Sequence, residues 1–170
     1  STFSGDPLQF VKWKRTFEGL IGQKRIGACD KLALLERYTA GEAAECIEGM
    51  LYRSDEEAYH DAWKLLNERF GHPSIVLNAF RRKLATWPKI GPREYLALRK
   101  FSDFLIAIDN AMMHIPGLQI LNDEEENKKL LQKLPDWLIT KWGGVVADRD
   151  SKNLSYPSFH QFSDFMSTQA

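Results

Sequence analysis

Apolar residues recur at intervals of three and four along most of this chain, and that period limits the chain to helical structure. The period is clearest in two stretches, Phe10, Trp13, Phe17 and Ile21, and Tyr95, Leu98, Phe101, Leu105 and Ile108. No run of alternating β-branched residues is long enough to form a sheet. The sequence therefore predicts an all-α protein.

Capping and helix-breaking residues divide this period into about nine helices. Predicted helix starts lie at Asp6-Pro7, at Asp30, at the capping box Ser54-Asp55-Glu56-Glu57 and at Asn122-Asp123. Glycines at positions 22, 41 and 71 are expected to separate helices, because glycine is favoured just past a helix end. The polar segment 148–155 is expected to be a loop.

Residues 87–92 contain two prolines and a glycine, a composition that cannot continue a helix. We expect this segment to link two lobes, residues 1–88 and residues 89–170. About five helices fall in the first lobe and about four in the second.

The charges of the chain are balanced, with 23 basic and 23 acidic residues, so neither half has the basic excess that drives non-specific binding of nucleic acid. Balanced charge also permits self-association, because long-range repulsion between copies is absent. Cys29 and Cys46 are expected to be buried, as small hydrophobic side chains in a reducing compartment. No apolar run is long enough for a membrane span, and the first residues lack the pattern of a signal peptide.

The sequence contains no signature of a catalytic nucleophile, a metal site or a phosphate-binding loop. The four histidines are scattered, and the acidic run at residues 123–126 is explained by the dipole of the helix that it begins. We therefore expect no enzyme activity, no cofactor, no metal and no small-molecule substrate.

Three motifs of the sequence resemble those of one known family. They are Phe3, Gly5, Asp6 and Pro7 leading into Phe10, Trp13 and Phe17; Leu65-Leu66 with Glu68-Arg69-Phe70-Gly71; and Lys133-Leu134-Pro135 with Trp142. In this order they are similar to the capsid-like region of the Gag polyprotein of Pao-type (Bel/Pao) long-terminal-repeat retrotransposons. A host protein derived from such a Gag would look the same. Residues 90–94 match the major homology region of retroviral capsids only loosely, which favours the Pao-type relationship.

The resemblance implies a two-lobe helical capsid protein that assembles with copies of itself. The first lobe would form rings of five or six subunits and the second lobe would dimerise between rings, closing a shell around the RNA of the element. Such virus-like particles would be cytoplasmic. The sequence contains no CCHC zinc knuckle, so the RNA would be packaged mainly by segments outside this chain.

Three sets of exposed polar residues are the candidate sites. For the ring contact we choose the polar face of the first helix, Lys12, Arg15 and Thr16. For the lobe dimer we choose Lys128, Lys129, Gln132 and Trp137. The strongest basic cluster, Arg81, Arg82 and Lys83, is a candidate contact for RNA or another anion, although at most two of these three residues can share a helix face.

A second hypothesis comes from another class of protein. The chain would be a monomeric helical adaptor, which could itself descend from a Gag, and a cleft between its helices would bind an amphipathic peptide.

Overall fold

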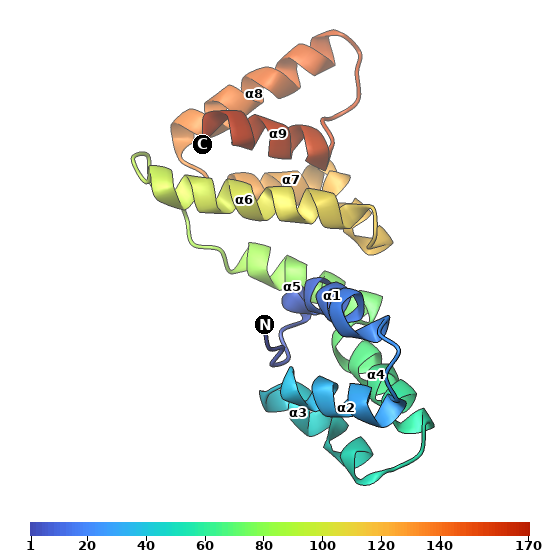
Figure 1. Cartoon of the computed structure of the whole chain (residues 1–170). Coiled ribbons are helices and arrows are strands. Elements are labelled where there is room, and N and C mark those ends of the chain that lie inside the picture. The colour runs from blue at the N-terminus through green and yellow to red at the C-terminus, as the bar shows by residue number, and fades with distance from the viewer. The chain divides into compact units, whose positions relative to one another are not determined.

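The computed structural model describes all 170 residues, and its regular structure is entirely helical (Figure 1). The α-helices are α1 (Pro7–Phe17), α2 (Ala28–Arg37), α3 (Gly41–Ile47), α4 (Glu57–Phe70), α5 (Pro73–Ala85), α6 (Tyr95–Met112), α7 (Glu124–Leu131), α8 (Asp136–Ser151) and α9 (Phe159–Gln169). A π-helical turn, η1 (Glu18–Gly22), and two 3₁₀ helices, η2 (Glu48–Tyr52) and η3 (Pro116–Asn122), complete the order. The predicted all-α class is confirmed, with five α-helices before residues 87–92 and four after them.

Packing divides the chain into unit 1, residues 1–79, and unit 2, residues 80–170. The division falls inside α5, whereas the proline and glycine content places a boundary after residue 88. The difference arises because the apolar residues at the end of α5 pack within unit 2: the ring of Phe104 on α6 stacks with Phe80 and with Trp87, at centroid distances of 6.1 and 5.3 Å. Proline and glycine mark where a helix ends, which need not be where its packing partners change.

The core of unit 1 is built around the side chain of Phe3, which is 2% exposed. Its ring packs against Phe10, Trp13 and Phe70, with ring centroids 5.0–5.3 Å apart. The extended backbone at Phe3 is also fixed, because its N–H donates to the carbonyl of Tyr38 and its carbonyl accepts from the N–H of Ala40. Two backbone hydrogen bonds and three aromatic contacts thus tie the start of the chain to α1, α2 and α4.

Two glycines make this packing sterically possible. Gly5 has a φ of +126°, a conformation that side-chain-bearing residues rarely adopt, and it turns the chain from Phe3 into α1. A Cβ added to Gly71, at the end of α4, would lie 2.8 Å from Cδ2 of Phe10 and closer still to Cε2. Asp6 then caps α1 as predicted, its side chain accepting from the N–H of Leu8 at 3.0 Å.

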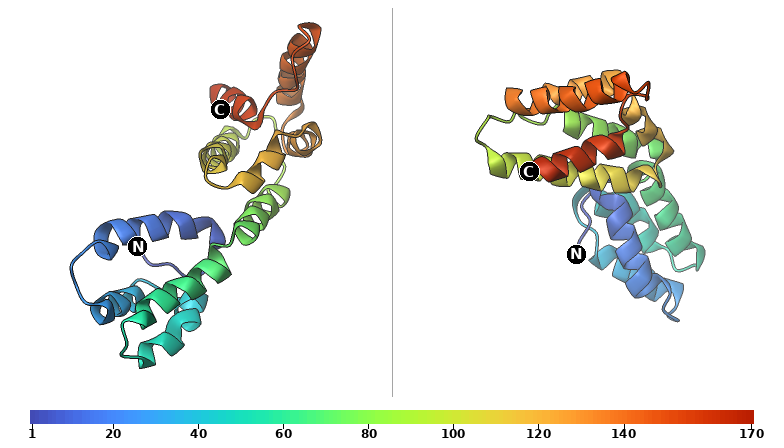
Figure 2. Two further views of the ribbon diagram at one scale, coloured as in Figure 1. Left: turned by 90° about the vertical axis from the view of Figure 1, so that its right-hand side faces the viewer. Right: turned by 90° about the horizontal axis from the view of Figure 1, so that it is seen from above.

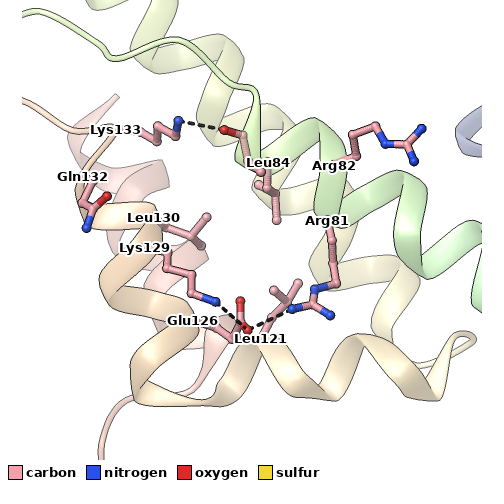
Figure 3. A pocket seen from close by; sticks show the side chains of 10 residues that line it. Arg81, Arg82, Leu84, Leu121, Glu126, Lys129, Leu130, Gln132 and Lys133 are labelled. Carbon is pink, nitrogen blue, oxygen red and sulfur yellow. Dashed lines mark hydrogen bonds and ion pairs between the residues drawn. The ribbon is translucent and has the colours of Figure 1, made fainter.

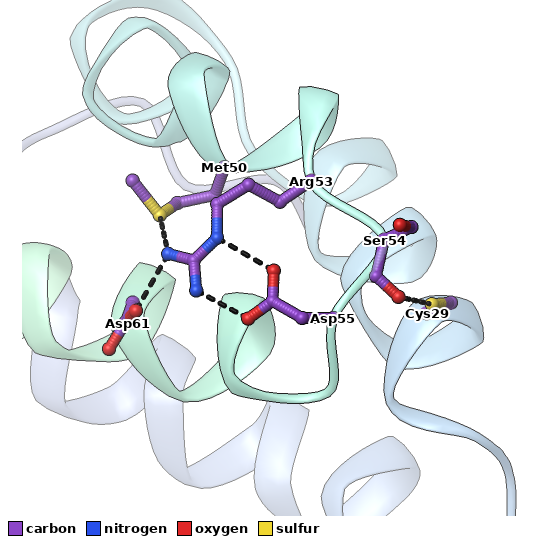
Figure 4. Close-up of polar contacts among 6 residues, drawn as sticks. All are labelled: Cys29, Met50, Arg53, Ser54, Asp55 and Asp61. Atoms are coloured by element: carbon purple, nitrogen blue, oxygen red, sulfur yellow. Dashed lines mark hydrogen bonds and ion pairs between the residues drawn. The ribbon is translucent and has the colours of Figure 1, made fainter.

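The loop before α4 is held by Arg53 and not by the predicted capping box (Figure 4). The guanidinium of Arg53 donates to both carboxylate oxygens of Asp55, to Asp61 on α4 and to the sulfur of Met50. The hydrogen bond from Arg53 lowers the pKa of Asp55 below its ordinary value. Helix α4 begins at Glu57, three residues after Ser54, and has no side-chain cap, so the predicted capping box is not formed.

Three further local predictions are wrong. Helix α2 begins at Ala28, so Asp30 lies in its first turn and does not cap it. Cys29 is exposed, with its Sγ 3.6 Å from the carbonyl of Ser54, while Cys46 is buried as expected (Figure 4). The segment predicted as a loop from residue 148 continues α8 to Ser151, where hydrogen bonds from Ser151 and Lys152 back to Asp148 support the last turn.

In unit 2, α9 lies along α6, and the buried faces of both helices form the core together with η3 (Figures 1 and 2). Helix α8 diverges from α9 toward its carboxyl end, and it buries only Leu138 and Trp142. Its last two turns therefore lie largely outside the core of the unit. A bilayer-spanning helix would require a longer apolar stretch than any helix of this chain provides.

We predict that Gly71→Ala lowers the free energy of unfolding by about 1–3 kcal/mol, because the new methyl group overlaps the ring of Phe10 and forces the aromatic core to shift. Urea denaturation followed by tryptophan fluorescence measures this change. Gly49→Ala is the matched control, since a Cβ at that position meets nothing within 4 Å. Equal stability of the two variants would contradict the steric role of Gly71.

A second prediction concerns His160, which joins α9 to α6 through Nδ1 to Asp109, at 2.6 Å, and lies 3.2 Å from Asp164 through Nε2. The hydrogen bond to Asp109 raises the pKa of His160 above its ordinary value of 6.5. The charged ring therefore stabilises the fold fully below pH 6.5, and this contribution is lost as the pH rises through the folded-state value. We expect the melting temperature to fall slightly over that interval, and His160→Gln to remove this component. The exposed His114, which forms no ion pair, gives the control variant His114→Gln, whose pH profile should match that of the unmodified protein.

Candidate functional site

A pocket of about 480 Å³ lies in unit 2 between the end of α5 and α7 (Figure 3). Its floor is apolar, and four basic side chains surround it against a single carboxylate. The lining residues are Arg81, Arg82, Leu84, Ala85, Leu121, Glu126, Lys129, Leu130, Gln132 and Lys133. We call this site the basic pocket. The excess of positive charge is local, because the chain as a whole carries no net charge.

Glu126 on α7 organises two of the four cations. Its Oε1 accepts from Nη2 of Arg81 at 3.1 Å and from Nζ of Lys129 at 3.3 Å. The side chain of Glu126 is 14% exposed, and its carboxylate is held between the two donors. Since an arginine carries five N–H donors and only one is used here, most of the hydrogen-bonding capacity of Arg81 remains available.

Lys133 closes the opposite side of the basic pocket. Its Nζ donates to the carbonyl of Ala85 at 2.9 Å, at the carboxyl end of α5, where the helix dipole favours a cation. The backbone carbonyl of Lys133 accepts from the N–H of Ile90 at 2.7 Å, which fixes the segment after α7 next to the segment after α5. Two of the ammonium's three N–H groups still face the pocket or the solvent.

The position of α7 depends on Asn127, the residue after Glu126. Asn127 is 4% exposed, and its Oδ1 accepts from Nε1 of Trp142 on α8, at 3.0 Å, and from the hydroxyl of Tyr156. One buried amide therefore joins α7, α8 and the segment before α9. Asn122, which precedes α7, does not cap this helix as predicted, because the Oδ1 of Asn122 accepts from the N–H of Phe159.

The structure separates the three residues of the predicted anion contact. Arg81 and Arg82 line the basic pocket, with the guanidinium of Arg82 pointing away from Glu126 (Figure 3). Lys83 does not line it, and its Nζ lies over the rings of Phe104 and Trp87, 4.4 and 5.8 Å from their centroids. Two of the three residues thus line the same pocket, which is the largest number that helical geometry allows on one face. The contact with RNA itself stays a prediction.

The four residues chosen for the lobe dimer have different surroundings. Lys129 and Gln132 line the basic pocket, whereas Lys128 lines a second groove between α7 and α8 and pairs with Glu124 and Glu125. Trp137 is half-buried, and its Nε1 donates to the carbonyl of Pro92 at 3.2 Å. The interface stays a prediction.

The three residues chosen for the ring contact do share a face of α1. Lys12, Arg15 and Thr16 are exposed, and Thr16 Oγ1 donates to the carbonyl of Lys12 at 3.0 Å. Lys12 and Thr16 also line a shallow groove of about 240 Å³ beside residues 1–4. Their role in assembly stays a prediction.

Sequence reasoning missed Glu126, Lys133 and the floor of the basic pocket. Helical spacing could place Lys129 and Lys133 on one side of a predicted helix, but their nearness to Arg81 depends on how α7 and the segment after it pack against α5. Chemically, the arrangement offers guanidinium and ammonium donors around a concave surface, which suits the binding of an anion. No three His, Cys, Asp or Glu side chains lie close enough together to hold a metal ion.

We predict that Asn127→Ala lowers the free energy of unfolding by about 2–3 kcal/mol, because the buried N–H of Trp142 then loses its acceptor. Chemical denaturation provides the measurement. Asn110→Ala is the matched control on α6, since the exposed Asn110 donates only to the carbonyl of Ile106 in its own helix, and we expect a change below about 0.5 kcal/mol. A small effect at both positions would show that Asn127 does not hold α7 in place.

The chain was compared with family models, curated proteins and solved structures. A family described as a protein of unknown function, DUF1759, matches residues 3–148. No curated protein and no solved structure matches the chain significantly. Because the matched residues make up most of the sequence, the chain belongs to the DUF1759 family, a domain found in retrotransposon Gag- and Pol-like proteins.

Proposed function

We propose that this chain is the capsid-like region of a Bel/Pao-type Gag polyprotein, or of a host protein derived from one, and that it acts by self-assembly. The observation that carries the proposal is the family match over residues 3–148 of an all-helical chain with two packing units. Copies of the chain would form a shell around RNA through ring-forming and dimerising contacts. Many weak symmetric contacts are sufficient for a stable shell.

The roles of the motif residues support the relationship to Gag. Phe3, Phe10 and Phe70 are core residues of unit 1, while Gly5 and Gly71 permit their packing. Similar motifs in Pao-type Gag would specify the same packing. The motifs thus encode a fold, and the activity resides in the surfaces that the fold presents.

For the contact of the second lobe we favour the groove between α7 and α8. This groove has a volume of about 550 Å³, and its apolar lining includes Leu131, Ile139, Val146 and Leu154. Val146 lies in the part of α8 that buries no residue, and Leu154 is 50% exposed. A second copy seated there would remove apolar surface from water without disturbing the core. For the ring contact we keep the exposed face of α1 that contains Lys12, Arg15 and Thr16.

The same groove is what a monomeric adaptor would need to bind an amphipathic helix. The two functions differ in one measurable property, because an adaptor stays monomeric as its concentration rises and a capsid does not.

We predict that the mass of the protein, measured by light scattering, rises with concentration, and that Val146→Asp weakens this association. A carboxylate in the groove would have to be desolvated against apolar side chains of a partner, so we expect at least about a tenfold shift to higher concentration. Thr140→Asp is the matched control, because it adds the same charge to an exposed position of α8 outside the groove lining.

Negative-stain imaging of the concentrated sample would then show closed particles or tubes. A protein that remains monomeric at every concentration would contradict the capsid proposal, and tight binding of a helical peptide by that monomer would support the adaptor. If Val146→Asp and Thr140→Asp weakened the association equally, the proposal of self-association would stand, but the α7–α8 groove would be excluded as the contact surface.

A further inference from the structure

We infer that the basic pocket binds a phosphate-bearing ligand of two or more negative charges. The inference concerns a binding site within one copy of the chain, so it does not depend on assembly. The shared chemistry of the ligand is a cluster of phosphate oxygens, supplied either by a small polyphosphate or by the backbone of RNA.

The donors of the pocket are arranged for such a ligand. Arg81, Lys129 and Lys133 each make one hydrogen bond within the protein and keep further N–H groups available. Arg82, whose guanidinium points away from Glu126, adds positive charge at the edge of the pocket (Figure 3). Guanidinium and ammonium groups together bind phosphate oxygens through charge-assisted hydrogen bonds. Leu84 and Leu130 form an apolar floor that limits the water competing for these donors (Figure 3).

Glu126 explains how the empty pocket is stable and why its ligand carries more than one charge. The four cations repel one another, and the single carboxylate holds Arg81 and Lys129 in place through 3.1 and 3.3 Å contacts. The surplus of positive charge that remains is greater than a singly charged anion can neutralise. A compact ligand with several negative charges matches it better, while Glu126 repels that ligand and moderates its affinity.

The fold positions the cations independently of the ligand. Lys133 is fixed by the carboxyl end of α5, and α7 is fixed by the buried amide of Asn127. The pocket is therefore preorganised, and a ligand does not have to order its main elements on binding.

The test is a calorimetric titration of the full chain with tripolyphosphate at low ionic strength and at a protein concentration where it is monomeric. The double variant Lys129→Gln/Lys133→Gln should bind about tenfold more weakly, because it removes two ammonium groups from the pocket. The matched control is Arg99→Gln/Lys100→Gln, which removes two exposed charges of α6 that do not line the pocket and should change the affinity little.

Glu126→Gln provides a second, independent prediction of opposite sign. It keeps the size of the side chain but removes the competing charge, so tripolyphosphate should bind roughly threefold more tightly. Thermal melts of all variants without ligand establish that each is folded.

Absence of tripolyphosphate binding would overturn the inference. Equal weakening by the pocket and control variants would also overturn it, because the ligand would then respond to the overall charge of the chain and not to the pocket. Weaker binding by Glu126→Gln would overturn the role of the pocket as well. Competition between tripolyphosphate and a single-stranded RNA oligonucleotide identifies the source: displacement of the RNA assigns RNA phosphates to the pocket, and its absence assigns a small polyphosphate. Because binding is measured on the monomer, failure of this inference would leave self-assembly unaffected, and the reverse also holds.

Discussion

The packing of aromatic rings around Phe3 is the constraint on which unit 1 depends. Phe3 lies outside any helix, yet its ring contacts Phe10, Trp13 and Phe70 from two different helices, and its backbone is bonded to the segment after α2. Burying a side chain of this size contributes about 1.5–3 kcal/mol. The ring of Phe10 occupies the space that a side chain at position 71 would need. The same aromatic packing therefore favours glycine at the end of α4.

Unit 2 combines stability and a candidate site on one helix. Asn127 points into the core and joins α7 to Trp142 and Tyr156, while the preceding residue, Glu126, faces the basic pocket and pairs with Arg81 and Lys129. Because consecutive residues of a helix point in different directions, the buried amide fixes the helix that presents the charges. Any change that moves α7 would therefore alter the core and the pocket together.

The sequence predicted the helices far better than their local polar contacts. Helical class follows from apolar spacing, and helix number follows from the capping and helix-breaking residues between the helices. The capping box at residues 54–57 is not formed, since α4 begins only at Glu57 and Arg53 holds the preceding loop through Asp55. Asn122 accepts a hydrogen bond from Phe159, distant in sequence, instead of capping α7. Polar side chains have several partners of similar energy, and tertiary proximity selects among them. For the same reason only Arg81 and Arg82 of the basic pocket were predicted as anion contacts, whereas Lys129 and Gln132 were assigned to a dimer contact.

The sequence by itself determined the all-α class, the cap of α1 and the family match over residues 3–148, because these depend on contacts close in sequence or on residue identity alone. Only the tertiary structure decided that packing divides the chain within α5, that the carboxyl-terminal part of α8 lies outside the core, and that Lys129 and Lys133 meet Arg81 around Glu126. These features depend on contacts between residues of different helices, such as Arg81 with Glu126, which no local pattern specifies.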